Sequence, residues 1–183
     1  MLVDTSLPTD LHKVKEASIL ANELGFDGIF AAEVTADPFV TSAVASQHVQ
    51  NMDLGTKIAV AFARTPMTTA YAAYNLGELS DGRFHLGLGT QVRAHVTRRF
   101  SMPWSQPSAR MREYVVAMKE IWSSCRTGDP LAFSGEFYEH SLMTEYFVPP
   151  TTTAAAPPVW LAAVGPRLAE VAAEVADGIV LHG

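Results

Sequence analysis

Residues 79–91 read LSDGRFHLGLGTQ, a tight turn followed by a strand in which glycine stands at every second position. Successive side chains of a strand point to opposite faces, so the face that carries Gly87 and Gly89 has no side chains at those positions. We expect a flat ring system to occupy the space that these glycines leave. Glycine in a strand also permits tight packing inside a barrel, and that alternative stays open.

The spacing of these glycines excludes a dinucleotide-binding fingerprint. Such a fingerprint requires G-x-G-x-x-G, normally after the first strand of the sheet. The series that begins at Gly87 reads GLGTQV, so Val92 stands where the third glycine is required. The strand is also the fourth of the chain, and no acidic residue follows it at the usual distance. The pattern therefore does not indicate a Rossmann nucleotide site.

Short apolar runs alternate with helical patterns on both sides of this strand. Strands are predicted at 1–7, 26–33, 54–62, 83–89, 159–165 and 177–183, and helices at 9–25, 37–48, 65–79, 108–122 and 165–176. Asp37–Pro38 and Thr65–Pro66 are typical of helix starts, in which a capping residue precedes a proline. Strict alternation predicts an α/β fold with parallel βαβ units. An open doubly wound sheet and a closed (β/α) barrel are both compatible with it.

Composition limits the class of protein. The chain has 183 residues, 48% of them hydrophobic, and a formal net charge of −6. We predict one domain, residues 1–183, with an irregular insertion at 126–158. The acidic balance argues against a nucleic-acid partner, and no apolar run approaches the ~20 residues of a membrane helix. A single cysteine, Cys125, and the lack of a signal-peptide pattern favour a cytoplasmic protein.

Several segments, in order along the chain, resemble the luciferase-like oxidoreductases. They are GFDGIFAAE at 25–33, LGTKIAVAFARTP at 54–66, LSDGRFHLGLGTQ at 79–91, ARMREYVVAMKEIW at 109–122 and PPVWLAAVGPRLAEVAAEVADGIVLHG at 157–183. Members of this family are (β/α)8 TIM-barrel proteins that use flavin or deazaflavin. The forms EVTADPF and AVAFARTP look most like the branch that uses the deazaflavin coenzyme F-420.

The resemblance implies that the barrel is incomplete. The family forms eight strands, whereas about six βα units are recognisable in this chain. An incomplete barrel has unpaired strand edges, which are a liability for solubility. Truncation of a longer parent, closure by a partner chain and a naturally shortened relative all stay open, and we favour truncation. A homodimer is one further assembly that we consider.

The resemblance also assigns cofactor-binding residues to the carboxyl ends of the strands, where barrel enzymes carry their chemistry. These residues are Lys57, Ile58, Thr90, Gln91, Ala163, Val164 and Gly165. The first pair corresponds to a non-prolyl cis peptide that supports the ring, the second contacts the ring or its ribityl tail, and the last three bind the phosphate at a helix N-terminus. Each assignment has an alternative. Lys57 could be a strand residue that faces solvent, Thr90 and Gln91 could be a polar loop start, and the helix end at Gly165 could lack a ligand.

Glu33 is the predicted catalytic residue, because related enzymes place an acidic residue at the end of the second strand. Enclosure by the neighbouring FAAE and DPF segments would suit its carboxyl group to donate or accept a proton. The alternative is an exposed carboxylate that bonds to Thr35 or to a helix start. The histidines lack metal-ligand spacing, so no metal site is predicted.

The expected function follows from the resemblance. It is that of an oxidoreductase that transfers a hydride between coenzyme F-420 and a small-molecule organic substrate. One alternative is a monooxygenase on the same fold that uses flavin mononucleotide (FMN). The other is a non-catalytic cofactor-binding protein or an inert fragment of a longer enzyme.

Overall fold

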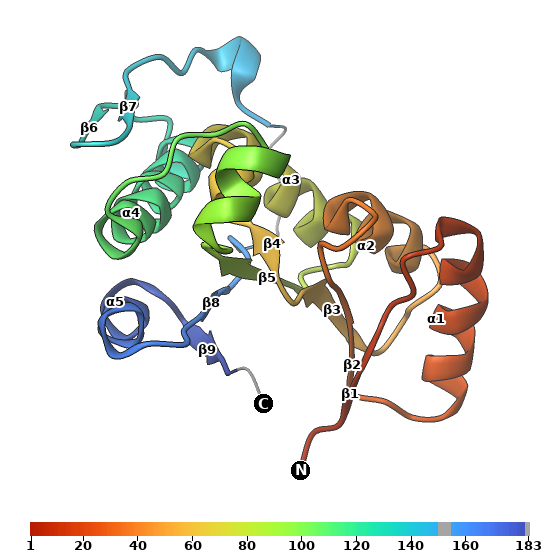
Figure 1. The fold of residues 1–183 in the computed structure, drawn as a ribbon. Coiled ribbons are helices and arrows are strands. Elements are labelled where there is room, and N and C mark those ends of the chain that lie inside the picture. Colours follow the sequence, from red (N-terminus) through yellow and green to blue (C-terminus); the bar gives the residue numbers. More distant parts are fainter. Residues whose placement is uncertain (150–154, 182–183) are drawn as a thin grey trace.

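A computed structural model describes residues 1–149 and 155–181, and shows a parallel sheet with helices along its outer side (Figure 1). The strands of this sheet are β1 (Asp4–Ser6), β2 (Gly28–Ala31), β3 (Asp53–Thr56), β4 (Ala59–Val60), β5 (Phe84–Gly89), β8 (Val159–Ala162) and β9 (Gly178–Val180). Their order is β1-β2-β3-β5-β8-β9, and β4 pairs with β5. Parts of the predicted insertion and of the predicted last strand, at 150–154 and 182–183, lie outside the described residues.

The helices form one layer on the outer side of the curled sheet. They are α1 (Val14–Glu23), α2 (Pro38–Ser46), α3 (Pro66–Leu79), α4 (Pro107–Thr127) and α5 (Pro166–Val175). Each helix contacts the next one in chain order, which an open sheet wound on both faces would not allow. The fold is therefore of the (β/α) barrel type, and the described strands form an incomplete barrel (Figure 1).

The predicted helix starts are confirmed. The Asp37 carboxylate accepts hydrogen bonds from the backbone N–H groups of Phe39 and Val40, with Pro38 at the first turn of α2. Thr65 caps α3 in a reciprocal arrangement with Thr68. These local signals fix where each helix leaves the strand before it.

The hydrophobic core lies between the sheet and the helices. Leu54, Phe84 and Leu86 are fully buried on the strands. On α4, Met111, Val115 and Met118 are also fully buried and belong to the same hydrophobic cluster. Burial of this kind supplies most of the free energy that stabilises a fold.

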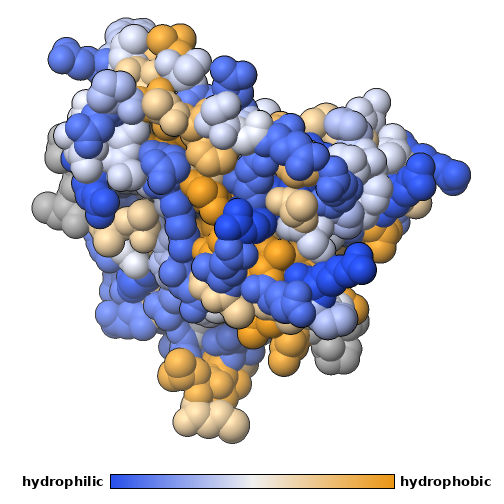
Figure 2. Space-filling view, turned by 90° about the vertical axis from the view of Figure 1, so that its left-hand side faces the viewer, coloured by the Kyte–Doolittle hydropathy of each residue, from blue (hydrophilic) through white to orange (hydrophobic). Residues whose placement is uncertain are grey.

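The two ends of the sheet expose hydrophobic side chains. At the β9 end these are Val164, Ile179 and Leu181, and Met1–Val3 are exposed before β1. Figure 2 shows hydrophobic surface in a hollow between hydrophilic side chains on the side that lies at the left of Figure 1. Among the described strands β1 and β9 have one neighbour each, as the incomplete barrel implied.

Several features differ from the sequence prediction; α4, for example, continues to Thr127 whereas the predicted helix stops at 122, and the first strand is confined to Asp4–Ser6. The strand predicted at 54–62 is broken into β3 and β4 by a cis peptide bond between Lys57 and Ile58, and residues 61–63 form a 3-10 helix. The helix predicted at 37–48 ends at Ser46. The polar segment after β5 contains a π-helix, η3 (His95–Arg99), that no sequence pattern indicated.

A short antiparallel hairpin follows α4, formed by β6 (Phe133–Ser134) and β7 (Glu139–His140). The Glu113 carboxylate on α4 accepts hydrogen bonds from the backbone N–H groups of Glu136, Phe137 and Tyr138, at 2.8, 2.7 and 2.7 Å. Glu113 therefore ties the tip of this hairpin to the helix by three bonds, and Arg110 Nε adds one to the Tyr138 hydroxyl at 2.8 Å.

Replacing Glu113 with alanine is expected to release the hairpin. Because charge-assisted hydrogen bonds to one carboxylate are lost together, chymotrypsin should cleave after Phe137 or Tyr138 about 10-fold faster or more. Glu120→Ala, an exposed position on the same helix, is the matched control and should leave the cleavage rate unchanged. Equal rates for the two variants would show that the carboxylate does not hold the hairpin.

Candidate functional site

The carboxyl ends of neighbouring strands meet at one edge of the sheet. The Glu33 N–H after β2 donates to the carbonyl oxygen of Ile58 at 3.2 Å. Strand β4 places Val60 opposite Gly89 at the end of β5, and β5 pairs in parallel with β8. The structure therefore brings together the strand ends that carry the predicted site residues.

The space beside the two strand glycines is filled by the chain itself, so the expectation that a ring system lies there is wrong. A Cβ atom on Gly87 would lie 2.0 Å from the backbone oxygen of Thr56 on β3. A Cβ atom on Gly89 would lie 2.9 Å from Cδ1 of Ile58. The glycines permit close packing of β5 against its neighbours, which was the open alternative.

The peptide bond between Lys57 and Ile58 is cis, as the resemblance implied. The Lys57 side chain turns to the first strands of the sheet, where Nζ lies 3.2 Å from Oδ2 of Asp4 and 4.9 Å from the ring centre of Phe30. Ile58 instead packs beside Gly89. Of the predicted pair Lys57 and Ile58, only the Ile58 side chain adjoins the end of β5. The Lys57 amine pairs with Asp4 on β1 instead.

Thr90 and Gln91 are half-buried and bond within their own loop. The Thr90 hydroxyl donates to the carbonyl oxygen of Gln91 at 3.1 Å, and Oε1 of Gln91 accepts from the Val92 N–H at 3.0 Å. Gln91 has a φ of 60°, in the left-handed region. These contacts fix the loop that leads into η3, and a role in binding the cofactor stays a prediction.

The N-terminus of α5 is accessible. Ala163 is buried and its N–H donates to Val180 at 3.2 Å, whereas Val164 and Gly165 are exposed. Gly165 is the N-cap residue, no side chain caps the helix, and a Cβ atom on Gly165 would meet nothing within 4 Å. Pro166 has no N–H, and the Leu168 N–H donates to the carbonyl oxygen of Gly165 at 3.1 Å. The N–H groups of Gly165 and Arg167, together with the helix dipole, are therefore what this end offers to an anion.

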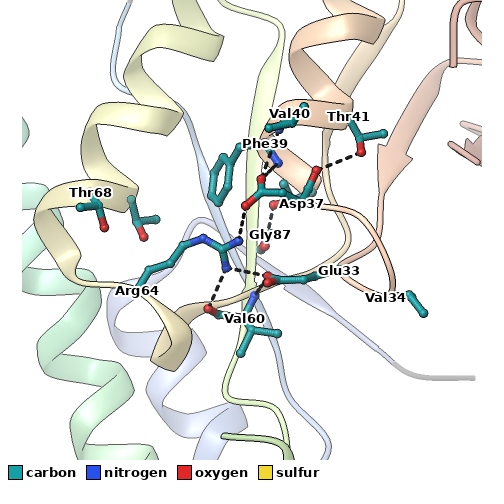
Figure 3. Close-up of polar contacts among 12 residues, drawn as sticks. Glu33, Val34, Asp37, Phe39, Val40, Thr41, Val60, Arg64, Thr68 and Gly87 are labelled. Carbon is teal, nitrogen blue, oxygen red and sulfur yellow. Dashed lines mark hydrogen bonds and ion pairs between the residues drawn. The ribbon is translucent and has the colours of Figure 1, made fainter. Parts of the chain in front are cut away.

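Glu33 lies in an ion-paired network rather than in an apolar enclosure (Figure 3). Its Oε2 accepts from Arg64 Nη1 at 2.6 Å and from the Val60 N–H at 2.7 Å. Arg64 Nη2 donates to Oδ2 of Asp37 at 2.7 Å. The side chains of Glu33 and Arg64 are only 6% and 17% exposed. The alternative of an exposed carboxylate bonded to Thr35 is therefore not what the structure shows.

The charges of this network stabilise one another. Burial alone would lower the pKa of Arg64, but its hydrogen bonds to Glu33 and Asp37 outweigh that effect and raise it. Burial alone would raise the pKa of Asp37, but the hydrogen bonds from Arg64 and from the α2 backbone lower it. Both groups are therefore held in their charged forms.

Arg64 is the residue of the site that sequence reasoning missed. It lies between a buried segment, Ala61–Phe62, and the helix cap Thr65. An arginine between a buried run and a helix start is a signal for an internal ion pair, because a cation so placed needs a partner. Its partner Glu33 is 31 residues away in the sequence, which is why spacing alone did not reveal it.

Replacing Asp37 with asparagine is expected to lower the melting temperature by an amount that depends on pH. Asparagine is a good N-cap, so the substitution mainly removes the charge that faces Arg64. The folded-state pKa of Asp37 lies below its unfolded value of about 3.9. The charge on Asp37 therefore stabilises the fold above the unfolded pKa. This stabilisation is lost as the pH falls through the folded-state pKa. Thermal unfolding from about pH 7 to about pH 3 should show the difference shrinking, and a constant difference would contradict this account.

Comparison with known protein families gives a match along the chain. The sequence model of the luciferase-like monooxygenase family matches residues 2–183. An uncharacterized protein of Mycobacterium tuberculosis is 45% identical over 180 residues, which are 98% of this chain and 53% of that protein. An F-420-dependent glucose-6-phosphate dehydrogenase of Intrasporangium calvum is 30% identical over 185 residues, covering 92% of this chain and 53% of that enzyme. The chain thus spans about half the length of the curated relatives it matches.

Solved structures of low sequence identity share the fold. A monooxygenase from Streptomyces bottropensis has a TM-score of 0.82 at 20% identity, over 98% of this chain and 59% of that chain. A coenzyme F-420-dependent tetrahydromethanopterin reductase from Methanopyrus kandleri has a TM-score of 0.76 at 20% identity, over 99% of this chain and 55% of that chain. A third structure is the oxygenating component of a diketocamphane monooxygenase from Pseudomonas putida, in complex with FMN. Its TM-score is 0.72 at 13% identity, over 88% of this chain and 52% of that chain.

The helices within the described ranges do not meet the requirements of a membrane span. None of them combines the length and the apolar character that crossing a bilayer requires.

Proposed function

Since this chain belongs to the luciferase-like monooxygenase family, we propose that it binds coenzyme F-420. We further propose that it binds this cofactor as part of an oxidoreductase, which transfers a hydride between the deazaflavin and a small organic substrate. The relative from Intrasporangium calvum and the reductase from Methanopyrus kandleri, both named as F-420-dependent, support the choice of cofactor.

The observation that carries the proposal is the accessible N-terminus of α5, which follows β8, the strand that pairs with β5. Its uncapped N–H groups suit the phosphate of the cofactor, and Gly165 leaves open space in front of them. Ile58, Gly89 and Ala162 adjoin one another with small or aliphatic side chains. The half-buried Ile58 side chain, which fills the space beside Gly89, suits contact with the flat face of a ring. The residues present therefore fit the cofactor.

Bound F-420 would supply the ring carbon that donates or accepts the hydride. The role of the protein is then to bind the cofactor and to orient its ring. The exposed backbone at 164–165 and the first turn of α5 would hold the phosphate, and Ile58 would lie against the ring. The ion-paired and hydrogen-bonded carboxylate of Glu33 favours a role other than the proton transfer expected from the sequence.

FMN is the second candidate cofactor. A helix N-terminus binds the phosphate of FMN as readily as that of F-420, and a structure of similar fold contains FMN. A monooxygenase that uses FMN on this fold would share the same strand ends. An inert fragment is the third reading, because the chain spans about half of its curated relatives.

Titration of the purified chain with each cofactor tests the proposal. We expect the fluorescence of F-420 to change saturably on addition of the chain, with weaker or no response from FMN. Tight binding of FMN without a response to F-420 would favour the monooxygenase. A chain that folds cooperatively and responds to neither cofactor would contradict both proposals.

A further inference from the structure

Glu33 contacts one short segment, Ile58–Val60, at two points. Its backbone N–H donates to the carbonyl oxygen of Ile58 at 3.2 Å. Its carboxylate Oε2 accepts from the N–H of Val60 at 2.7 Å. The end of β2 therefore holds the start and the end of this segment through a single residue.

Arg64 closes the same network from the other side (Figure 3). Its Nη1 lies 2.6 Å from Oε2 of Glu33 and 3.2 Å from the carbonyl oxygen of Val60. Its guanidinium carbon lies 5.1 Å from the ring centre of Phe39, and Nη2 bonds to Asp37 at the start of α2. Both backbone polar groups of Val60 are thus bonded to this ion pair.

We propose that Glu33 and Arg64 are positioning residues, which together hold the backbone of Ile58–Val60 in place against the ring of the cofactor. The proposal rests on the cofactor assignment made above, and it gives Glu33 a different part from that of a proton donor. Oε2 already accepts two hydrogen bonds, one of them from a cation, and the side chain is almost fully buried. Charge-assisted bonds of this kind are short and specific in direction.

The first test needs no cofactor. The amide hydrogen of Val60 should exchange slowly in the native chain, and about 10-fold faster or more in Glu33→Ala and Arg64→Gln, because each change removes a charged partner. Arg112→Gln, which breaks the exposed pair with Glu174, is the matched control and should leave exchange at Val60 unchanged. Unchanged exchange in Glu33→Ala and Arg64→Gln would overturn the proposal.

The double variant Glu33→Leu/Arg64→Leu, which has no acceptor for the Val60 N–H, covers the case in which Arg64→Gln alone fails to fold. It removes both buried charges together, so no unpaired carboxylate remains in the interior. Its Val60 exchange should still exceed that of the native chain. Native-like exchange in the folded double variant would overturn the proposal as well.

The second test measures affinity for F-420 by fluorescence titration. Glu33→Ala and Arg64→Gln should each weaken binding by about 10-fold, while Arg112→Gln should not. Glu33→Gln keeps an oxygen that can accept from Val60, so a positioning role predicts that it restores much of the affinity and turnover lost in Glu33→Ala. A proton-transfer role predicts normal affinity in both Glu33 variants and equal loss of turnover, which would overturn the proposal.

The two tests separate this proposal from the cofactor assignment. If the native chain does not bind F-420, the assigned function fails and the positioning of a ring fails with it. Val60 exchange would still decide whether Glu33 and Arg64 hold the segment. Faster exchange at Val60 combined with unchanged affinity for F-420 would overturn the positioning role alone.

Discussion

Replacing Gly87 with alanine is expected to prevent the chain from reaching a stable native fold. The added Cβ atom would lie 2.0 Å from the backbone oxygen of Thr56, far inside van der Waals contact. The two strands cannot move apart freely, because the Thr56 hydroxyl also donates to the carbonyl oxygen of Gly87 at 2.6 Å and this contact is fully buried. We expect a loss of more than about 4 kcal/mol in the free energy of unfolding.

Circular dichroism during heating, together with soluble yield, measures this effect. Gly77→Ala is the matched control, since its Cβ would lie 3.3 Å from a ring carbon of Pro157 and alanine favours the helix α3. The control should melt close to the native chain. A Gly87→Ala chain that melts within about 3 °C of the native one would show that β3 and β5 are not packed as described.

Replacing Gly165 with aspartate is expected to abolish cofactor binding while preserving the fold. The position has an extended backbone and open space for a side chain, and aspartate is a favourable N-cap residue, so the melting temperature should stay level or rise. The carboxylate would occupy the end of α5 that is proposed to bind the phosphate. Repulsion between these like charges should weaken F-420 binding by about 100-fold or more.

Controls at the same position separate charge from shape. Gly165→Ala adds a methyl group where nothing lies within 4 Å and should bind F-420 almost as the native chain does. Gly165→Asn caps the helix without a negative charge and should lie between the other two variants. Native affinity in Gly165→Asp would place the phosphate elsewhere.

The sequence predicted the order of elements well, because the signals for it are local. Alternation of apolar runs and helical patterns gave the parallel sheet, and Asp37–Pro38 and Thr65–Pro66 marked the starts of α2 and α3. The resemblance implied the cis peptide at Lys57–Ile58, which the structure contains. The apolar run LGTKIAVAF by itself gave no sign of that break, since each of its residues also suits a continuous strand.

The contacts within the site could not be predicted from local pattern. The glycines of β5 showed where side chains are missing, but only the position of Thr56 and Ile58 shows what fills the space. The pairing of Glu33 with Arg64 joins residues that are 31 positions apart. Only the curvature of the sheet and the start of α3 bring these two side chains together.

Amide chemical-shift mapping of the chain during titration with F-420 tests the central claim most directly. The account predicts saturable shifts confined to the strand ends and the first turn of α5, at residues 58–60, 89–91, 163–165 and 167–168. The hairpin β6–β7 and the outer helix α1 should not respond. Saturable shifts centred on those outer elements, or no shifts at all in a folded chain, would contradict the claim that these strand ends jointly bind the cofactor.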